Sequence, residues 1–363
     1  MILLLGKRDL PVDGVEDYCA FLGEALERRG VQLQKERVSW SERGWLQALW
    51  HLWQSSAAWR DDWVLLQYTA LGWSRRGFPF GAVAAIEILR WRGARCAVVF
   101  HEPFGLGGPR RIDGIREACQ NWVMRSLYHS AEKIIVTRPV ETITWLTRGD
   151  RKAAFVPIGA NIPARLRRQV PSIERNGKQR TVAVFCLSDP PNQLREIGDI
   201  SHALRMTAMD NAKRRIVFLG RGTAEAQGEI ERAFDQTSVE VTNLGLRSAE
   251  EVADTLAGAD AMLCVRGELS PGRGSAIAGI ACGLPIIAYG ESARSFPLSQ
   301  GGVCLVPYGD REALGAALRQ ILDDMELRER LSATSREAQE NYFSWDVIAE
   351  RFVQALDEPR AKE

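Results

Sequence analysis

The sequence lacks long apolar runs and paired cysteines. No stretch reaches the ~18 consecutive apolar residues that a membrane-spanning helix needs. The apolar start MILLL (1–5) is too short for a signal peptide and is typical of a first buried strand. None of the seven cysteines forms a CxxC pair, which favours reduced, buried thiols over a disulfide or zinc framework. We therefore expect a cytoplasmic protein.

The signatures of several other protein classes are also missing. There is no Walker phosphate loop, and no basic tract interleaved with aromatic residues, so P-loop chemistry and a nucleic-acid partner are not expected. No acidic pair or His/Cys cluster has the spacing of metal ligands, so no metal is expected. The stretch SPGRGSAIAGIACGLPIIAYG (270–290) is rich in glycine but contains no acidic residue.

Apolar strand-like runs alternate with helix-like runs along all 363 residues. Strands rich in Val, Ile and Leu that alternate with helices indicate parallel sheets buried on both faces. A chain of this length favours two such domains over one. The strand-like runs are 1–5, 62–68, 94–100, 133–137 and 153–159, then 181–187, 214–220, 239–245, 260–265, 284–289 and 302–307. The sequence therefore predicts two doubly wound α/β domains.

The segment ARLRRQVPSIERNGKQR (164–180) is polar and without periodicity, as in a linker. We assign residues 1–165 to the first domain, 166–180 to the linker, 181–340 to the second domain and 341–363 to a C-terminal helix and tail. Ligands of open α/β sheets bind beyond the carboxyl ends of the strands, so a cleft between the two domains is the default site.

The charge is unevenly distributed. Residues 1–165 hold 23 Lys and Arg against 17 Asp and Glu, whereas residues 166–363 hold 24 against 29. A basic first half could face a phosphate-bearing lipid or a membrane surface, or it could be ordinary surface. The segment 39–63 carries six of the eleven tryptophans. It fits a helix packed on the sheet better than an interfacial membrane helix, because it has few basic residues.

Five motifs occur in an order that resembles one family. They are VVFHEPF (98–104), VPIGANIP (156–163), VFLGRG (217–222), ACGLPIIAY (281–289) and FSWDVIAERF (343–352). Together they resemble the GT-B glycosyltransferases, in particular glycosyltransferase family 4. The resemblance implies two Rossmann-like domains facing across a cleft, with a C-terminal helix that crosses back onto the first domain. It also implies a nucleotide-sugar donor bound by the second domain and no cofactor or metal.

The sequence departs from the family pattern at the donor site. Alignment on Cys282 and Gly283 places the family's two glutamates at Ser270 and Ala278. The usual Arg and Lys pair after the first strand of the second domain is reduced to Arg195. The resemblance therefore implies a divergent member.

The Gly-rich turn before residue 275 keeps the features of a phosphate site. A helix N-terminus offers free N–H groups, and glycines let a phosphate approach the backbone. We expect Ser270, Arg273, Gly274 and Ser275 to bind the donor, with Arg273 replacing the missing cation pair. Ser275 could cap the helix or donate to a phosphate oxygen. The alternative for Arg273 is a solvent-facing side chain.

Further candidates lie at predicted strand ends. Gly220, Arg221 and Gly222 could approach the nucleotide or could form a plain tight turn. Glu268 could reach the sugar hydroxyls or could be a surface acid.

In the first domain, Gly14 opens a helix where the family places a glycine turn near the donor phosphates. His101 and Glu102 end a strand and are candidates for catalysis, although a lone histidine is often structural.

The resemblance implies a retaining, metal-independent glycosyltransferase. It would move a sugar from a nucleotide-diphosphate sugar to a glycan or lipid-linked acceptor in bacterial surface polysaccharide synthesis. Peripheral contact with the inner face of the membrane through the first domain fits the basic charge. The alternative is a catalytically inactive GT-B homologue that acts as a binding or partner subunit, which the missing glutamates favour.

Overall fold

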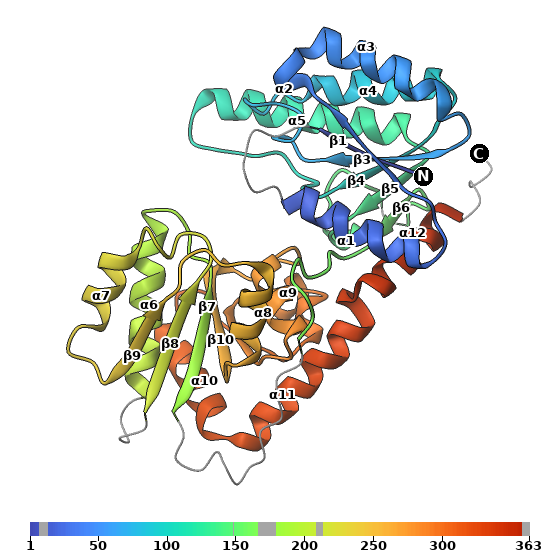
Figure 1. The fold of residues 1–363 in the computed structure, drawn as a ribbon. Coiled ribbons are helices and arrows are strands. Elements are labelled where there is room, and N and C mark those ends of the chain that lie inside the picture. Colours follow the sequence, from blue (N-terminus) through green and yellow to red (C-terminus); the bar gives the residue numbers. More distant parts are fainter. Residues whose placement is uncertain (7–13, 148, 166–178, 208–212, 358–363) are drawn as a thin grey trace. The chain divides into compact units, whose positions relative to one another are not determined.

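The computed structural model of the chain describes residues 1–6, 14–147, 149–165, 179–207 and 213–357. The chain divides into two compact units (Figure 1). Unit 1 contains residues 1–158 and the segment that begins at Trp345, and unit 2 contains Gly159–Ser344. Of the predicted linker 166–180, residues 166–178 lie outside the described residues.

Unit 1 is built on a six-stranded parallel sheet with the order β2-β1-β3-β4-β5-β6. Its strands are β1 (Ile2–Gly6), β2 (Gln34–Val38), β3 (Trp63–Tyr68), β4 (Arg95–Phe100), β5 (Lys133–Val136) and β6 (Ala153–Phe155). Its helices are α1 (Gly14–Arg28), α2 (Trp40–Arg43), α3 (Trp45–Ser55), α4 (Phe80–Trp91), α5 (Arg111–Ser130) and α12 (Trp345–Asp357).

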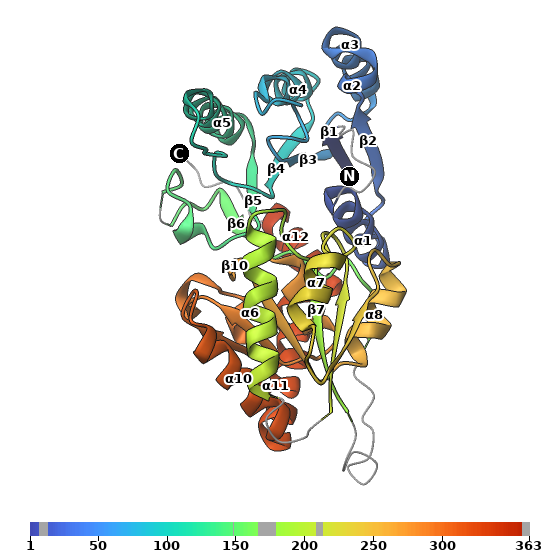
Figure 2. The same cartoon turned by 90° about the vertical axis from the view of Figure 1, so that its left-hand side faces the viewer.

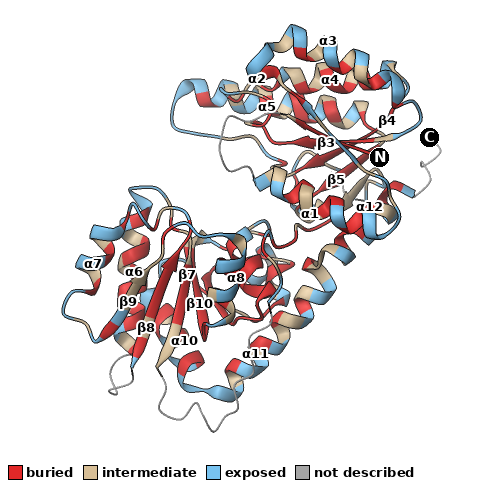
Figure 3. Ribbon diagram, viewed as in Figure 1, coloured by how far each residue is buried: buried red, intermediate tan, exposed pale blue. Residues whose placement is uncertain are grey.

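Both faces of this sheet are buried, which explains the unbroken apolar run at the start of the sequence. In β1, Ile2 and Leu4 pack with residues of α3, α4 and α5. Leu3 and Leu5 point the other way and pack with α1 and α12. Figure 3 shows the buried strands between the two helix layers. Alternation of side chains along a strand thus makes every position of β1 a core position.

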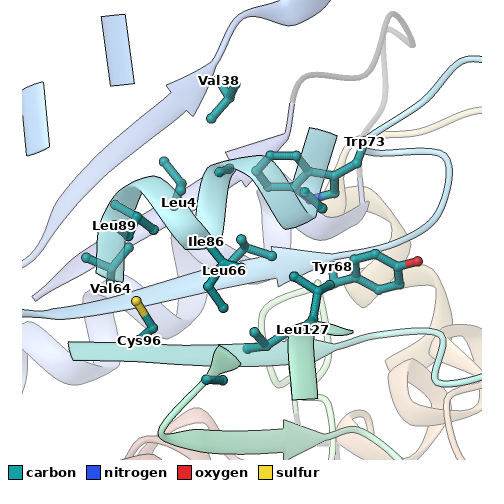
Figure 4. Close-up of a cluster of buried hydrophobic side chains, with 14 of the residues drawn as sticks. Leu4, Val38, Val64, Leu66, Tyr68, Trp73, Ile86, Leu89, Cys96 and Leu127 are labelled. Atoms are coloured by element: carbon teal, nitrogen blue, oxygen red, sulfur yellow. The ribbon is translucent and has the colours of Figure 1, made fainter. Parts of the chain in front are cut away.

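The core on the α3–α5 side includes Trp73, which is fully buried (Figure 4). Its indole N–H donates to the main-chain oxygen of Gln67 at 2.8 Å. The loop that carries Trp73 lies against the end of β1, because a Cβ added at Gly6 would be 2.4 Å from the oxygen of Gly72. The carboxyl ends of β1 and β3 are therefore joined by tight packing.

Two features of unit 1 were not predicted from the sequence. The strand β2, with the sequence QKERV, was not predicted, because it is an edge strand whose residues are mostly exposed. The segment 39–63 does form helix α3 on the sheet, but the helix turns Ala48 and Leu52 inward. Leu46 and Trp50 face outward.

Helix α12 ends the described chain and packs in unit 1, as the resemblance implies. Its Ile348 and Phe352 are fully buried in the core under α1. The Trp345 ring stacks on Phe21 at 5.7 Å. An ion pair joins Arg28 of α1 to Asp346 at 2.9 Å.

Unit 2 has a second six-stranded parallel sheet with the order β12-β11-β10-β7-β8-β9. Its strands are β7 (Arg180–Phe185), β8 (Arg214–Leu219), β9 (Val239–Asn243), β10 (Ala261–Glu268), β11 (Ile286–Tyr289) and β12 (Val303–Val306). Its helices are α6 (Asn192–Thr207), α7 (Gln227–Phe234), α8 (Ala249–Ala257), α9 (Gly274–Ala281), α10 (Arg311–Asp323) and α11 (Met325–Ala338).

Helices α6 and α10 lie side by side on one face of this sheet (Figures 1 and 2). The Nε of Arg311 in α10 donates to Asp199 in α6 at 2.5 Å. Helices α8 and α9 lie together, and the Cys282 thiol donates to the oxygen of Ala253 at 3.7 Å. Strands β10, β7 and β8 are central, so their carboxyl ends meet at one edge.

Candidate functional site

The carboxyl ends of β7 and β8 are locked together by the predicted glycine turn. Gly220 and Gly222 have φ angles of 88° and 79°, which only glycine adopts readily. A Cβ at Gly220 would be 2.7 Å from the Phe185 ring, and one at Gly222 would be 2.6 Å from the oxygen of Leu187. Packing within unit 2 therefore requires glycine at both positions, as expected if they form a plain tight turn.

The glycines before α9 differ from those two. A Cβ added at Gly272 or Gly274 would meet no atom of the described residues within 4 Å. Neither has a positive φ. Because neither backbone angle nor packing within the described chain requires glycine there, the absence of side chains leaves the helix N-terminus open. The N–H groups of Gly274 and Ser275 come before the first hydrogen bonds of the helix, which Ala276 and Ile277 donate to the oxygen of Arg273 at 3.0 and 3.1 Å, so they have no intrahelical acceptor.

Ser275 does not cap α9. The N-cap residue is Arg273, whose side chain makes no capping hydrogen bond. Ser275 is buried, and its hydroxyl lies 3.9 Å from the thiol of Cys264 in β10. Ser270 closes the turn by accepting a hydrogen bond from the N–H of Arg273 at 2.9 Å.

Arg273 is held against the end of β10 and is only partly exposed. Its Nη2 donates to the oxygen of Arg266 at 2.8 Å and to that of Glu268 at 3.3 Å. The Glu268 side chain is exposed. Arg273 therefore does not extend freely into solvent, which was the alternative prediction, because these two carbonyls hold its guanidinium group near the N-terminus of α9.

Three arginines gather around two thiols at this edge. Burial raises the pKa of the Cys186 thiol, and the positive charges of Arg266 and Arg221 oppose the rise. Burial likewise raises the pKa of the Cys264 thiol, and Arg273 and Arg266 oppose it. The strands thus bring predicted Arg221 and Arg273 together with Arg266, a residue that sequence reasoning missed.

The guanidinium groups of Arg266 and Arg273 have hydrogen-bonding capacity to spare. Their Nε atoms are buried, and neither has a hydrogen-bond partner among the residues that the structure describes. A buried N–H of a charged group without an acceptor is costly, and an anion would supply the acceptor. The only signal for Arg266 in the sequence is its place at the end of an apolar strand.

In unit 1, His101 follows β4 and is hydrogen-bonded to Gln67 of β3. The distance between His101 Nε2 and Gln67 Oε1 is 2.9 Å. The amide of Gln67 donates to the oxygen of Leu65 at 3.3 Å, which leaves its Oε1 as the acceptor for His101. This pattern assigns the proton to Nε2 and leaves Nδ1 of His101 as an acceptor.

Burial lowers the pKa of His101 to about 4, so the imidazole is neutral at pH 7. The edge of Tyr18 packs on it at 4.8 Å between ring centroids, and Trp345 of α12 packs on Tyr18 at 5.2 Å. Glu102 is half-buried, and its charge helps burial to raise the pKa of Tyr68. Gly14 is the first residue of α1, where a Cβ would meet no atom of the described residues within 4 Å.

A separate hollow lies at the opposite edge of the unit 1 sheet. It has a volume of about 1060 Å³ and is lined by residues of α4, α5 and the starts of β4, β5 and β6, among them Arg90, Tyr128 and Lys152. None of the predicted site residues lines it.

Among the described ranges, no three His, Cys, Asp or Glu side chains are grouped so that they could hold a metal ion. Within those same ranges, no helix combines the length and the apolar character needed to span a bilayer.

No protein-family model and no curated protein matches the chain. Solved structures do resemble it over its whole length. The complex of Anabaena Alr3699/HepE with UDP and glucose is 14% identical, covers 99% of both chains and has a TM-score of 0.66. Sucrose-phosphate synthase from Thermosynechococcus elongatus is 19% identical over 98% of both chains, with a TM-score of 0.64.

A third similar structure is WaaG, a glycosyltransferase involved in lipopolysaccharide biosynthesis. It is 12% identical, covers 99% of this chain and 100% of its own, and has a TM-score of 0.58. At these identities the likeness concerns the fold. The two parallel six-stranded sheets with flanking helices, matched over the full chain, show that this protein has the GT-B fold of glycosyltransferases.

Proposed function

We propose that the chain is a glycosyltransferase that binds a nucleoside-diphosphate sugar at the carboxyl edge of the unit 2 sheet. The observation that carries the proposal is the open N-terminus of α9 beside the Nε groups of Arg266 and Arg273, which have no hydrogen-bond partner among the described residues. Free backbone N–H groups and forked guanidinium groups are the donors that a diphosphate needs. The likeness to a structure in complex with UDP and glucose supports this ligand class.

The arginines would neutralise the leaving diphosphate, so the proposed reaction is independent of metal. In it, the sugar–phosphate bond breaks, the acceptor oxygen bonds to the anomeric carbon, and the proton of the acceptor hydroxyl leaves with the nucleoside diphosphate. Neutral His101 would accept a hydrogen bond at Nδ1 from a sugar or acceptor hydroxyl. Glu102 and Glu268 stay candidates for binding the hydroxyl groups of the sugar or acceptor. The proposal includes retention of the configuration at the anomeric carbon of the transferred sugar.

The proposed acceptor is a glycan or a lipid-linked glycan, in bacterial surface polysaccharide synthesis. The likeness to WaaG supports that setting. The protein would work in the cytoplasm, with peripheral contact at the inner face of the membrane.

An inactive homologue is the second candidate. The positions registered with the family's glutamates hold Ser270 and Ala278, and Ala278 is buried inside α9. These two positions therefore provide no carboxylate for binding or catalysis. Such a protein could still bind a partner or glycan without transferring sugar.

The first test is a thermal-shift screen with nucleoside diphosphates and nucleotide sugars, beginning with UDP and UDP-glucose, with and without magnesium. A ligand at a hundred times its dissociation constant adds about 2.7 kcal/mol to the unfolding free energy. We expect a magnesium-independent shift that Arg273→Ala and Arg266→Ala each reduce. Losing one guanidinium contact to a phosphate should weaken binding by about tenfold or more.

The matched control is Arg232→Ala, which removes a 74% exposed arginine side chain of α7 in the same unit. It should leave the shift unchanged. If no nucleotide shifts the wild-type transition, the donor site is refuted. If a nucleotide binds but no donor is ever hydrolysed or transferred, the inactive homologue is the better description.

A further inference from the structure

Exposed apolar side chains are concentrated on one part of unit 1. Of the twelve exposed large hydrophobic residues in the described ranges, eight lie on α3, α4, α5 or the loop before α5. They are Leu46, Trp50, Phe80, Trp91, Phe104, Ile112, Ile115 and Trp122. None lies on α1 or α12, which cover the other face of the same sheet. Scattered exposed residues are normal, whereas a one-sided gathering marks an interaction surface.

Helix α3 is unusual for a surface helix because WLQALWHLWQS contains no Lys, Arg, Asp or Glu. The side that faces away from the sheet presents Leu46, which is 88% exposed, and Trp50, which is 63% exposed. An ordinary amphipathic helix places charged residues there. The core needs only the opposite side, with Ala48 and Leu52.

Contacts place the three helices next to one another. The Trp45 ring of α3 lies where a Cβ of Gly81 in α4 would be. Arg92, at the end of α4, lies over the Trp53 ring of α3 at 4.8 Å. Phe80 of α4 contacts Trp122 of α5 at 5.9 Å between ring centroids. We call the surface formed by Leu46, Trp50, Phe80, Trp91, Ile115 and Trp122 the outer face.

The charges around the outer face are mostly positive. Residues 39–130 contain 11 arginines and no lysine against seven acidic residues. Two acid–arginine pairs lie within the helices, Asp113 with Arg116 at 2.8 Å and Glu87 with Arg90 at 3.0 Å, which leaves nine arginines against five acidic residues. Five exposed arginines lie before α4 or on or before α5: Arg75, Arg76, Arg110, Arg111 and Arg125.

We infer that the outer face binds the surface of an anionic phospholipid membrane. Trp, Phe, Leu and Ile enter the interface, and the arginines contact lipid phosphates. This inference deepens the proposed function, because it names the surface through which the enzyme would reach a lipid-linked acceptor. Only the identity of that acceptor rests on the proposed function.

A second copy of the chain fits the outer face less well. A symmetric dimer through this surface would bring the same arginine-rich patch against itself. Like charges at close range oppose such contact, and the cores of protein interfaces are depleted of charge. Anionic lipids supply the opposite charge.

The test is co-sedimentation of the full chain with vesicles of phosphatidylcholine alone or mixed with phosphatidylglycerol, in the absence of any sugar donor. We expect binding to the anionic vesicles that high salt weakens. The double change Leu46→Gln and Trp50→Gln should lower the partition coefficient at least tenfold. Replacing Arg76 and Arg111 with Gln should lower it to a similar degree on anionic vesicles.

The matched control is Met325→Gln, a 42% exposed apolar residue on α11 of unit 2, which should bind vesicles like the wild type. Circular dichroism melts check that each variant is folded. Absence of wild-type binding to anionic vesicles would overturn the inference. The inference would also be overturned if analytical ultracentrifugation showed a wild-type dimer that dissociates in the Leu46→Gln and Trp50→Gln variant, and if neither the wild type nor this variant bound vesicles.

The nucleotide thermal shift, run on the same variants, separates this inference from the proposed function. Loss of vesicle binding with an intact nucleotide shift locates the defect in the outer face. Vesicle binding without any nucleotide shift would sustain the membrane surface and refute the donor site.

Discussion

At the scale of single residues, His101 shows how burial sets the chemistry available to a side chain. The ring sits between Gln67 and Tyr18, and burial lowers its pKa to about 4 from an ordinary value of 6.5. It therefore cannot act as a cationic acid near neutral pH. Its remaining capacity is that of a neutral donor and acceptor of hydrogen bonds.

The lowered pKa predicts a pH-dependent stability of unit 1. The unfolded chain binds a proton more readily than the folded one, so the stabilisation is complete above pH 6.5 and is lost as the pH falls towards 4. We expect a loss of about 2 kcal/mol, below the full shift because the residue is partly exposed. Replacing His101 with Gln should remove this part of the pH dependence.

Tryptophan fluorescence during urea unfolding measures the effect in unit 1 alone, since all eleven tryptophans belong to that unit. His129→Gln, at an exposed site on α5, is the control. An unchanged pH profile in His101→Gln would contradict the assigned pKa.

At the scale of elements, Arg328 joins two helices of unit 2. It lies in the first turns of α11, is fully buried, and donates from Nη1 to the oxygens of Ile321 and Leu322 at 2.8 and 2.9 Å. These carbonyls belong to the last turn of α10, so no N–H of that helix is left to donate to them. Between the helices, Asp324 caps α11 by accepting from the N–H of Leu327 at 2.9 Å.

Replacing Arg328 with Met should therefore lower the unfolding free energy of unit 2 by about 3 kcal/mol, because it leaves buried carbonyls without donors. The exposed Arg330 on the same helix, changed to Met, should have an effect within about 0.5 kcal/mol. Urea unfolding followed by circular dichroism measures both. The tryptophan transition of unit 1 should not move, and a shift of that transition alone would contradict the assignment.

At the scale of the whole molecule, the chain builds unit 1 from its two ends. Helix α12 follows unit 2 in the sequence, yet its apolar side completes the core beneath α1. The core therefore depends on a helix that lies far beyond residue 158.

Phe352→Ala tests this dependence. Phe352 is fully buried, and such truncations cost about 3–5 kcal/mol. We expect the tryptophan-detected unfolding free energy of unit 1 to fall by that amount, although the substitution lies at the end of the described chain. Gln354→Ala, at an exposed position of the same helix, should change little. A wild-type transition in Phe352→Ala would show that unit 1 does not need α12.

The fold was predictable because a strand that is buried on both faces of a parallel sheet appears in the sequence as a run of consecutive apolar residues. Eleven apolar runs correspond to strands of the two sheets, and FSWDVIAERF corresponds to α12 with its preceding turn. The polar strand β2 was missed, because an edge strand is half solvated and has no such run. The outward position of Leu46 and Trp50 could not be predicted either, because an apolar residue in a sequence does not reveal which side of a helix the sheet covers.

The sequence by itself determined the strand and helix alternation and the Gly-rich turn before α9, since these follow from the periodicity and backbone freedom of neighbouring residues. Only the tertiary structure decided that Arg266 joins Arg221 and Arg273, because β10, β7 and β8 are adjacent in space but not in order. It alone also decided that Gly220 and Gly222 meet β7 while Gly272 and Gly274 face open space. The physical reason is that contacts between distant segments arise when buried strands pair, and no local pattern records which strand becomes the neighbour of which.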